Sequence, residues 1–362
     1  MMFTYTEAGI RGGWIQLFLC ICLSLSPGVE SKSRALEIMD QYPLIDGHND
    51  LALRLRMIYN NRLSQLNLYK TPQVGLMKSR KIACLISVEG GHSIDSSLPT
   101  LRMFYQLGVR SMALTHTCNT PWAESSSSFY SHYQRNNNSL TRFGKAVVHE
   151  MNRLGMLVDL SHSSWETARA VLRHSRAPVI FSHSSVFTVC NNVRNVPDDL
   201  LHQLRNNSGL IMVNFYNSFI TCSENATVSN VADHFDHLKR AIGTESIGIG
   251  ADFEGAQNFP EGLKDVSKYP ALIEELIARN WTEQELAGVL RLNFLRVFQK
   301  VEEIRDEMLD TLPSEEEIPF EEANNDCRAM LIRPAKTVRS VGNGNASVGA
   351  FTCYILLINL LF

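Results

Sequence analysis

The chain has 362 residues, of which 44% are hydrophobic and 20% are charged, and its formal net charge is -3 at pH 7. This length and apolar content suffice for one large core or two medium ones. The Lys and Arg residues are scattered along the chain, so neither the net charge nor its pattern indicates a nucleic-acid partner.

Residues 1–31 have the pattern of a secretory signal peptide. Arg11 precedes a mostly apolar run over 14–25, and Ser26, Pro27 and Gly28 follow it. The run is short for a bilayer span, which needs about 20 residues. A buried N-terminal strand is the alternative interpretation.

Residues 343–362 are typical of a glycolipid-anchor signal that is removed from the mature protein. Small residues precede an apolar run over 348–362, and no charged residue follows that run. A tail-anchored span is the alternative, although it would be short for a bilayer. We therefore expect a lipid-anchored protein on the extracellular face of the plasma membrane.

In a secreted protein the glycosylation sequons can be used and the cysteines can form disulfides. The sequons in the body of the chain are at Asn137, Asn206, Asn225 and Asn280. The cysteines outside the processed ends are Cys84, Cys118, Cys190, Cys222 and Cys327. Because their number is odd, an oxidising compartment implies an intermolecular bridge or an isolated thiol.

Short apolar runs alternate with amphipathic segments along the body of the chain. Strands are predicted at 43–48, 82–89, 110–116, 156–162, 178–183, 209–215 and 246–252. Helices are predicted at 98–107, 141–154, 165–172, 231–242 and 281–301, and an irregular acidic segment at 302–339. Apolar strands that alternate with helices indicate a parallel sheet covered on both faces.

A metal-binding or catalytic residue type stands at the C-terminal end of six of these strands. The residues are His48, Glu89, His116, His162, His183 and Asp252. Active sites of (β/α)8 TIM-type barrels gather at this rim. A doubly wound sheet is the rival, but it concentrates its ligands at one switch point. The predicted fold class is therefore an α/β barrel.

Seven predicted strands are one fewer than such a barrel needs. No strand is evident between residues 51 and 81, where the second strand and its helix belong. We expect a barrel domain over 32–310 that is shortened there, followed by an acidic tail over 311–342 that contains Cys327. Loss of a strand leaves unpaired edges unless another segment takes its place.

The candidate ligands predict a site for two zinc ions. His48 and Asp50 are two residues apart and so share one face of an extended strand, although such a pair alone is more often a hydrogen-bonding pair. His162 and His183 end consecutive strands, and packing explains two such histidines poorly. We expect Glu89 to bridge the ions, with His48 and Asp50 on one zinc and His162 and His183 on the other.

Three further residues are candidates for acting on a substrate. Asp252 is placed to orient a water molecule and to pass its proton to a leaving amine, with a structural acid as the alternative. His116 is a candidate for stabilising a developing oxyanion. Arg194 is a candidate for binding a substrate carboxylate, with an ordinary surface arginine as the alternative.

These motifs resemble the membrane dipeptidase family of zinc peptidases. The resemblance covers about residues 36–301 and rests on segments such as PLIDGHNDL at 43–51, SVEGGHSIDSSL at 87–98 and LTHTCNTPWA at 114–123. It implies a (β/α)8 barrel with two zinc ions. It also implies hydrolysis of dipeptides, including cysteinyl-glycine substrates, and of some β-lactams.

The resemblance also implies roles for particular residues. The five expected ligands carry over, as do Asp252 as acid and base and His116 and Arg194 as substrate contacts, and Tyr216 lines the site. Cys190 and Cys222 match the intrachain disulfide of the family, and Cys327 matches a cysteine that links two subunits of a homodimer. Cys118 matches a half-cystine whose partner lies in a segment that this chain lacks.

Two other functions stay open. The same ligands suit a two-metal hydrolase that acts on other amides, in which Arg194 is unused. A barrel that fails to close suits a surface-anchored homologue that retains the ligands without catalysis.

Overall fold

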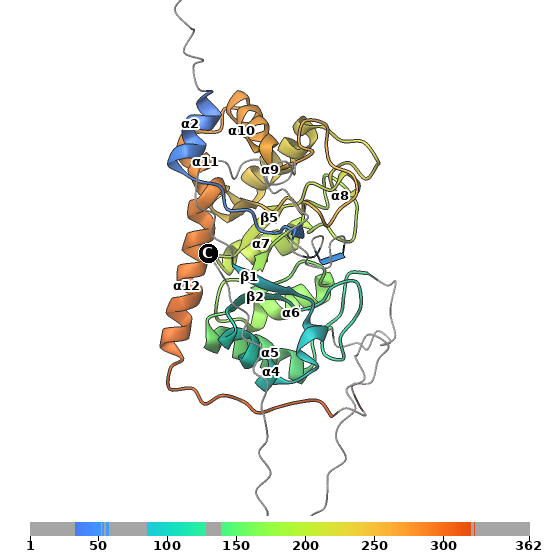
Figure 1. Cartoon of the computed structure of the whole chain (residues 1–362), viewed down its shortest axis with the longest axis vertical. Coiled ribbons are helices and arrows are strands. Elements are labelled where there is room, and N and C mark those ends of the chain that lie inside the picture. The colour runs from blue at the N-terminus through green and yellow to red at the C-terminus, as the bar shows by residue number, and fades with distance from the viewer. Residues whose placement is uncertain are drawn as a thin grey trace, which may run out of the picture. The chain divides into compact units, whose positions relative to one another are not determined.

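A parallel sheet of six strands organises the described part of the chain (Figure 1). The computed structural model describes residues 33–51, 53, 56–57, 85–127, 139–319 and 322. The strands are β1 Ile86–Glu89, β2 Val109–Ala113, β3 Leu157–Asp159, β4 Ile180–Phe181, β5 Leu210–Val213 and β6 Ile247–Ile249. They lie in the order β1-β2-β3-β4-β5-β6, so each pairs with its neighbour along the chain.

The first predicted strand extends this sheet beyond β6 through isolated parallel bridges. Asp46 pairs with Ile249 and Asn49 pairs with Phe253, and Gly47 donates its N–H to the carbonyl oxygen of Ile249 at 2.9 Å. The segment therefore occupies the place of a strand, although only single bridges hold it. All seven predicted strand segments thus contribute to the sheet.

The strand order decides between the two predicted architectures. A doubly wound sheet reverses its strand order at a switch point, whereas a TIM-type barrel runs in chain order. The chain-ordered sheet confirms the TIM-type α/β class. Among the described residues β1 pairs only with β2, so the sheet is not a closed barrel. Most of the shortened stretch between 51 and 81 lies outside the described residues.

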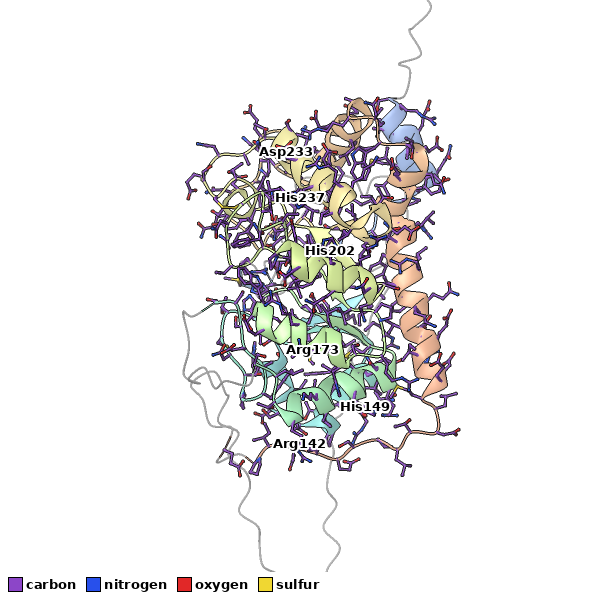
Figure 2. The ribbon with its side chains drawn as sticks, turned by 180° about the vertical axis from the view of Figure 1, so that it is seen from behind. Arg142, His149, Arg173, His202, Asp233 and His237 are labelled. Atoms are coloured by element: carbon purple, nitrogen blue, oxygen red, sulfur yellow. A yellow bond between two sulfur atoms is a disulfide. The ribbon has the colours of Figure 1, made fainter. Side chains whose placement is uncertain are left out.

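Helices cover the outer face of the sheet. They are α2 Arg34–Gln41, α4 Leu98–Gln106, α5 Arg142–Leu154, α6 Trp165–His174, α7 Asp198–Asn206, α8 Asn217–Ile220, α9 Val228–Ile242 and α10 Tyr269–Ala278. In α5, the side chain of Thr141 caps the N-terminus and Gly155 ends the helix in a left-handed conformation. Figure 2 shows the opposite surface of these helices, where Arg142, His149 and Arg173 are exposed.

Three helical segments follow α10, and the last of them packs against the strands. They are α11 Glu283–Ala287, a π-helical turn at Gly288–Leu292 and α12 Asn293–Glu307. Phe294 and Val297 of α12 share a buried cluster with Leu157, Leu210 and Met212 of the strands. The predicted irregular segment from 302 was therefore wrong at its start. The apolar spacing continues through Ile304 and Met308, which are 6% and 2% exposed.

The predicted signal peptide, the anchor signal, Cys84, Cys327 and Asn137 lie outside the described residues. Within the described part of the chain, no helix has the length and apolar character that crossing a membrane requires. Of the remaining sequon residues, Asn206, Asn225 and Asn280 are all exposed.

We expect acid to destabilise the protein through His234. Burial of this side chain lowers its pKa to about 4; its Nδ1 accepts the N–H of Val186 and its Nε2 donates to the carbonyl oxygen of Ile220. Between about pH 4 and 6.5 the unfolded chain therefore binds more protons than the folded protein. The free energy of unfolding accordingly decreases as the pH is lowered through that window. The free energy of unfolding from urea titrations should fall by about 2 kcal/mol more in wild type than in His234→Gln between pH 7 and pH 5.

Candidate metal centre

The loops after the strands bring the predicted ligands together at one end of the sheet. Glu89 is the last residue of β1, and the other side chains follow the strand ends or the bridged segment within a few residues. The group comprises His48, Asp50, Glu89, His116, His162, His183 and Asp252. Three overlapping sets of these side chains have ligand atoms within 4.8 Å of one another.

One oxygen of Glu89 lies at the centre of this group. Glu89 Oε1 is 3.0 Å from Nε2 of His162, 3.2 Å from Nε2 of His183 and 3.8 Å from Nε2 of His48. The side chain of His183 is 1% exposed and that of Glu89 is 22% exposed. The carboxylate thus faces both predicted sets of ligands at once.

The second set lies around His48. Its Nε2 is 3.3 Å from Oδ2 of Asp50 and 4.0 Å from Oδ1 of Asp252. The His48 ring stacks on the His183 ring with centroids 4.0 Å apart, which brings the two sets together. The grouped side chains therefore overlap at Glu89 and His48, and His48 belongs both to a set with Glu89 and His183 and to a set with Asp50 and Asp252.

The donor atoms fit a divalent cation by their spacing. Tetrahedral zinc with bonds of about 2.0–2.1 Å places neighbouring ligand atoms about 3.3 Å apart. Nε2 of His162 and Nε2 of His183 are 3.0 Å apart, and both face Glu89 Oε1. Two imidazole lone pairs at this separation repel each other unless a proton or a cation lies between them.

Burial sets the protonation of the side chains in the metal-free protein. It lowers the pKa of His162 to about 3, with the nearby charge of Arg194 adding to the effect. Burial likewise lowers the pKa of His183. Two neutral imidazoles are the form that binds a metal ion.

The carboxylates and His48 shift one another's pKa values. Burial opposes the ionisation of Glu89, but the close imidazoles of His162, His183 and His48 outweigh it and lower the Glu89 pKa. Burial also opposes the charge on His48, yet the hydrogen bond to Asp50 and the charges of Glu89 and Asp252 raise its pKa to about 9. A cation at this place would take over the role of that proton.

Asp252 has a different environment from the other carboxylates. Burial raises its pKa to about 6, and Nδ2 of Asn214 donates a hydrogen bond to its Oδ2 at 2.9 Å. Asp252 and His162 both adopt left-handed backbone conformations, with φ of 63° and 67°. Such strain in non-glycine residues is found at functional sites.

The candidate substrate residues surround the cluster. The His116 side chain is 38% exposed, more than any other side chain of the cluster, and its Nε2 lies 3.7 Å from Oε2 of Glu89. The guanidinium of Arg194 lies 3.3 Å from the carbonyl oxygen of His183 and stands over the ring of Phe219. Tyr216 precedes α8 and packs its ring edge-on against the same phenylalanine.

A disulfide holds the loop that carries Arg194. Cys190 and Cys222 are bonded, with Cα atoms 5.4 Å apart, as the family resemblance implied. The bond connects this loop to the chain that follows α8. Cys118 is buried, at 7% exposure.

Sequence reasoning missed the side chains that support the site from behind. Asp46 accepts N–H bonds from Ala251 and His48 and the hydroxyl of Tyr269, and it thereby ties the first segment to the loop after β6. Asn214 supports Asp252 in a similar way. Asp46 and Asn214 stood within the quoted or neighbouring motifs, but only the fold shows their partners.

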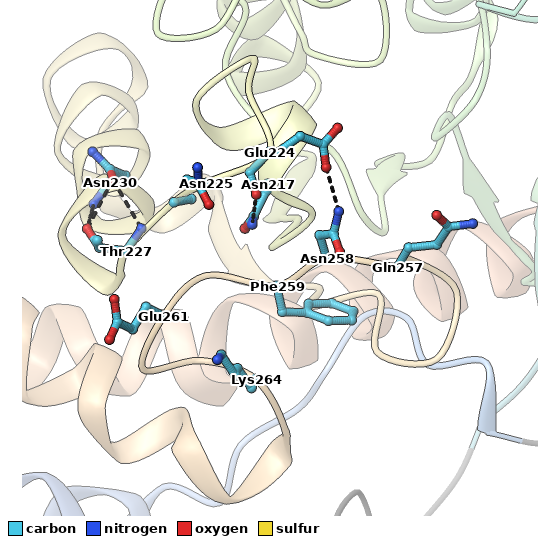
Figure 3. A pocket seen from close by; sticks show the side chains of 11 residues that line it. Asn217, Glu224, Asn225, Thr227, Asn230, Gln257, Asn258, Phe259, Glu261 and Lys264 are labelled. Carbon is cyan, nitrogen blue, oxygen red and sulfur yellow. Dashed lines mark hydrogen bonds between the residues drawn. The ribbon is translucent and has the colours of Figure 1, made fainter.

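A separate polar pocket lies beside α8 and α9 (Figure 3). Its volume is about 1000 Å³, and its lining is rich in amide side chains. The lining residues include Asn217, Asn225, Asn230, Gln257 and Asn258, and they include none of the candidate ligands. This pocket is therefore distinct from the cluster around Glu89.

The fold and the site together define a class of protein. A parallel sheet in chain order, with histidines and carboxylates converging at its C-terminal ends, is the arrangement of a metal-dependent hydrolase of the TIM-barrel kind. Solved structures agree on the fold. An amidohydrolase from Pseudomonas aeruginosa is 21% identical with a TM-score of 0.61, covering 74% of this chain and 98% of its own.

More specific likenesses come from the sequence. The model of the membrane dipeptidase family, Peptidase family M19, matches residues 56–311. Dipeptidase 3 of Macaca fascicularis is 44% identical and covers 84% of this chain and 74% of its own length, and Dipeptidase 3 of Mus musculus is 43% identical over 83% and 73%. A solved dipeptidase AC, a metallopeptidase of the same family, is 29% identical with a TM-score of 0.55, covering 60% of this chain and 65% of its own.

The chain therefore belongs to the membrane dipeptidase family, Peptidase family M19, and is a metallo-dipeptidase. This confirms the resemblance that the motifs indicated and the expectation of a hydrolase.

Proposed function

We propose that this protein hydrolyses dipeptides with two zinc ions held around Glu89. The observation that carries the proposal is that Oε1 of Glu89 faces Nε2 of His162, His183 and His48 at 3.0, 3.2 and 3.8 Å. His48 and Asp50 would hold one ion, and His162 and His183 the other. Two divalent cations supply a nucleophile from water at neutral pH and polarise the scissile carbonyl.

The side chains around the ligands would carry the remaining steps. Oδ1 of Asp252, which faces His48, would hold the proton of the attacking water and deliver it to the leaving amine. Asn214 keeps Oδ2 of Asp252 fixed and leaves Oδ1 for this task. His116, the most exposed group of the cluster, would face the oxyanion of the tetrahedral intermediate.

Arg194 would select substrates with a free carboxylate. A buried guanidinium binds a carboxylate in a two-pronged, charge-assisted pair, and burial lowers the pKa of Arg194 while Asp252, Glu89 and Asp159 oppose that effect. A short substrate such as cysteinyl-glycine places its C-terminal carboxylate one residue from the scissile bond. An arginine that binds a carboxylate one residue from the scissile bond would favour dipeptides over longer peptides.

Removal of the metal should abolish activity reversibly. We expect dialysis against a chelator to reduce dipeptide turnover at least a hundredfold and to lower the melting temperature, because neutral His162 and His183 then face each other without a cation. Zinc should restore both properties. Full turnover in protein that contains no metal by elemental analysis would refute the mechanism.

Removal of the guanidinium should distinguish dipeptides from other amides. Arg194→Ala is expected to raise KM for a dipeptide by about 100-fold, while turnover of a neutral amide analogue without a carboxylate changes little. Arg169→Ala is the matched control, because that arginine is only partly exposed, at 26%, and pairs with Asp199 rather than with the candidate ligands. An Arg194→Ala protein with normal KM for dipeptides would favour hydrolysis of other amides.

We also propose that the enzyme is secreted and lipid-anchored, with a signal peptide over 1–31, an anchor signal over 343–362 and the acidic tail between. The exposed sequon residues Asn206, Asn225 and Asn280 suit glycosylation. Cys327 would link two subunits. Migration as a monomer on a non-reducing gel would contradict the covalent link, and retention on cells after phospholipase treatment would contradict the anchor.

A further inference from the structure

A buried chain of hydrogen bonds leads from His183 away from the metal centre. Oγ of Ser182 lies 2.8 Å from Nδ1 of His183 and donates its hydrogen to Oδ2 of Asp159 at 2.5 Å. Asp159, Ser182 and His183 are 5%, 3% and 1% exposed. Because the bonds join the ends of β3 and β4, they depend on the sheet and not on a local turn.

The direction of these hydrogen bonds follows from the acceptors. Asp159 receives three donors, since its Oδ1 accepts the N–H groups of Ser161 and Ser182 and its Oδ2 accepts the Ser182 hydroxyl. A hydroxyl group has a single hydrogen. With that hydrogen directed to Asp159, Ser182 accepts from His183, so the imidazole hydrogen is on Nδ1 and the lone pair of Nε2 faces Glu89.

The neighbouring histidine lacks such support. Nδ1 of His162 is buried and makes no hydrogen bond to the described residues. The partner of a metal-binding imidazole normally fixes its tautomer and its orientation. Of the two histidines beside Glu89 Oε1, His183 therefore has its tautomer and ring orientation fixed by a hydrogen bond at Nδ1, whereas His162 does not.

We infer that Ser182 and Asp159 are positioning residues that fix His183 in the tautomer whose Nε2 binds metal. The inference rests on the proposed metal site. In most metal sites a carboxylate or a carbonyl group accepts the hydrogen bond from the imidazole nitrogen that does not bind metal. Here the Ser182 hydroxyl accepts that bond, and Asp159 in turn holds the hydroxyl. We therefore expect that the ion on the His162 and His183 side depends on this relay, whereas the ion on the His48 and Asp50 side does not.

Two substitutions separate this role from a merely structural one. Ser182→Ala removes the acceptor for Nδ1–H and leaves the tautomer unspecified. Asp159→Asn reverses the relay: its Oδ1 still accepts the two backbone N–H groups, so its Nδ2 donates to Ser182. The Ser182 hydroxyl then donates to Nδ1 of His183, which moves the imidazole hydrogen to Nε2. We therefore expect Asp159→Asn to weaken metal binding more than Ser182→Ala.

Ser161→Ala is the matched control. Ser161 is also fully buried at 0% exposure, but its Oγ accepts the backbone N–H of His183 at 3.0 Å and does not touch the imidazole nitrogens. That Oγ also makes a longer contact with the relay, 3.4 Å from the Ser182 hydroxyl, which already donates to Asp159. It should lose stability as the other variants do, while its affinity for zinc stays within about threefold of wild type. This control also applies if Asp159→Asn fails to fold.

The experiment is titration of the metal-free full-length proteins with zinc against a competing chelator. In wild type we expect two ions per chain; in Ser182→Ala one dissociation constant should rise by about 10- to 100-fold while the other is unchanged. Nitrogen-15 spectra of the histidines in metal-free protein should show the His183 hydrogen on Nδ1 in wild type and on Nε2 in Asp159→Asn.

The outcomes separate this inference from the proposed function. Wild-type protein that binds no zinc overturns the proposed metal site itself. Wild-type protein with two ions, together with equal zinc affinities for Ser182→Ala and Ser161→Ala, overturns the relay alone. So does a His183 hydrogen that remains on the same nitrogen in Asp159→Asn.

Discussion

Replacement of Glu89 by glutamine is expected to reduce kcat/KM for dipeptides on the order of a thousandfold. Oε1 of Glu89 lies within 3.0–3.8 Å of imidazole nitrogens from both halves of the site. Glutamine keeps the size of the side chain but removes its charge and replaces one oxygen with an NH2 group, which cannot bind a cation. Steady-state kinetics would measure the loss of kcat/KM, and elemental analysis would measure the accompanying loss of zinc.

Glu150→Gln is the control for the general effect of neutralising a buried carboxylate. Glu150 is 1% exposed and pairs with Arg102 and Arg153 on the helical side of the fold, at 3.2 and 2.8 Å. We expect this variant to unfold at a lower temperature and to keep its turnover per folded molecule. A Glu89→Gln protein that retains both zinc ions and normal turnover would contradict a bridging role.

Much of the fold could be predicted from the sequence because parallel strands leave a clear pattern. Strands β3 to β6 are short apolar runs buried on both faces, and in most cases a polar residue follows the end of a strand, as His183 follows Phe181 in β4. Since all these ends lie on one side of a parallel sheet, the pattern alone places residues that are distant in sequence at a common site. The gap in the barrel was visible for the same reason.

The supporting contacts could not be predicted, because they join residues whose separation carries no signal. Tyr269 reaches Asp46 across 223 positions, and neither residue type identifies the other. The end of α12 was missed for a related reason. Its last turns contain many charged residues and therefore resemble an irregular segment, although Ile304 and Met308 are buried against the sheet.

Gly255, three residues after Asp252, is constrained by contacts that only the fold shows. A Cβ atom on Gly255 would lie closer than 3.0 Å to Oδ2 of Asp50 and to Oδ1 of Asp252. Both carboxylates are partly buried, with side chains 17% and 13% exposed, so they cannot simply turn into solvent. The absence of a side chain at this position therefore leaves room for a metal ligand and for the proposed acid and base.

Gly255→Ala is accordingly expected to reduce kcat/KM on the order of a hundredfold, since a displacement of about 1 Å at the reacting groups has effects of this size. Kinetics and zinc titration of the purified variant would measure it. Gly243→Ala is the control: a Cβ there meets no atom within 4 Å, but the residue has φ of 79°. Backbone strain should lower its stability by about 1 kcal/mol without loss of activity. Equal activity of the two variants would show that Asp50 and Asp252 tolerate displacement, and would weaken their assignment to the reaction.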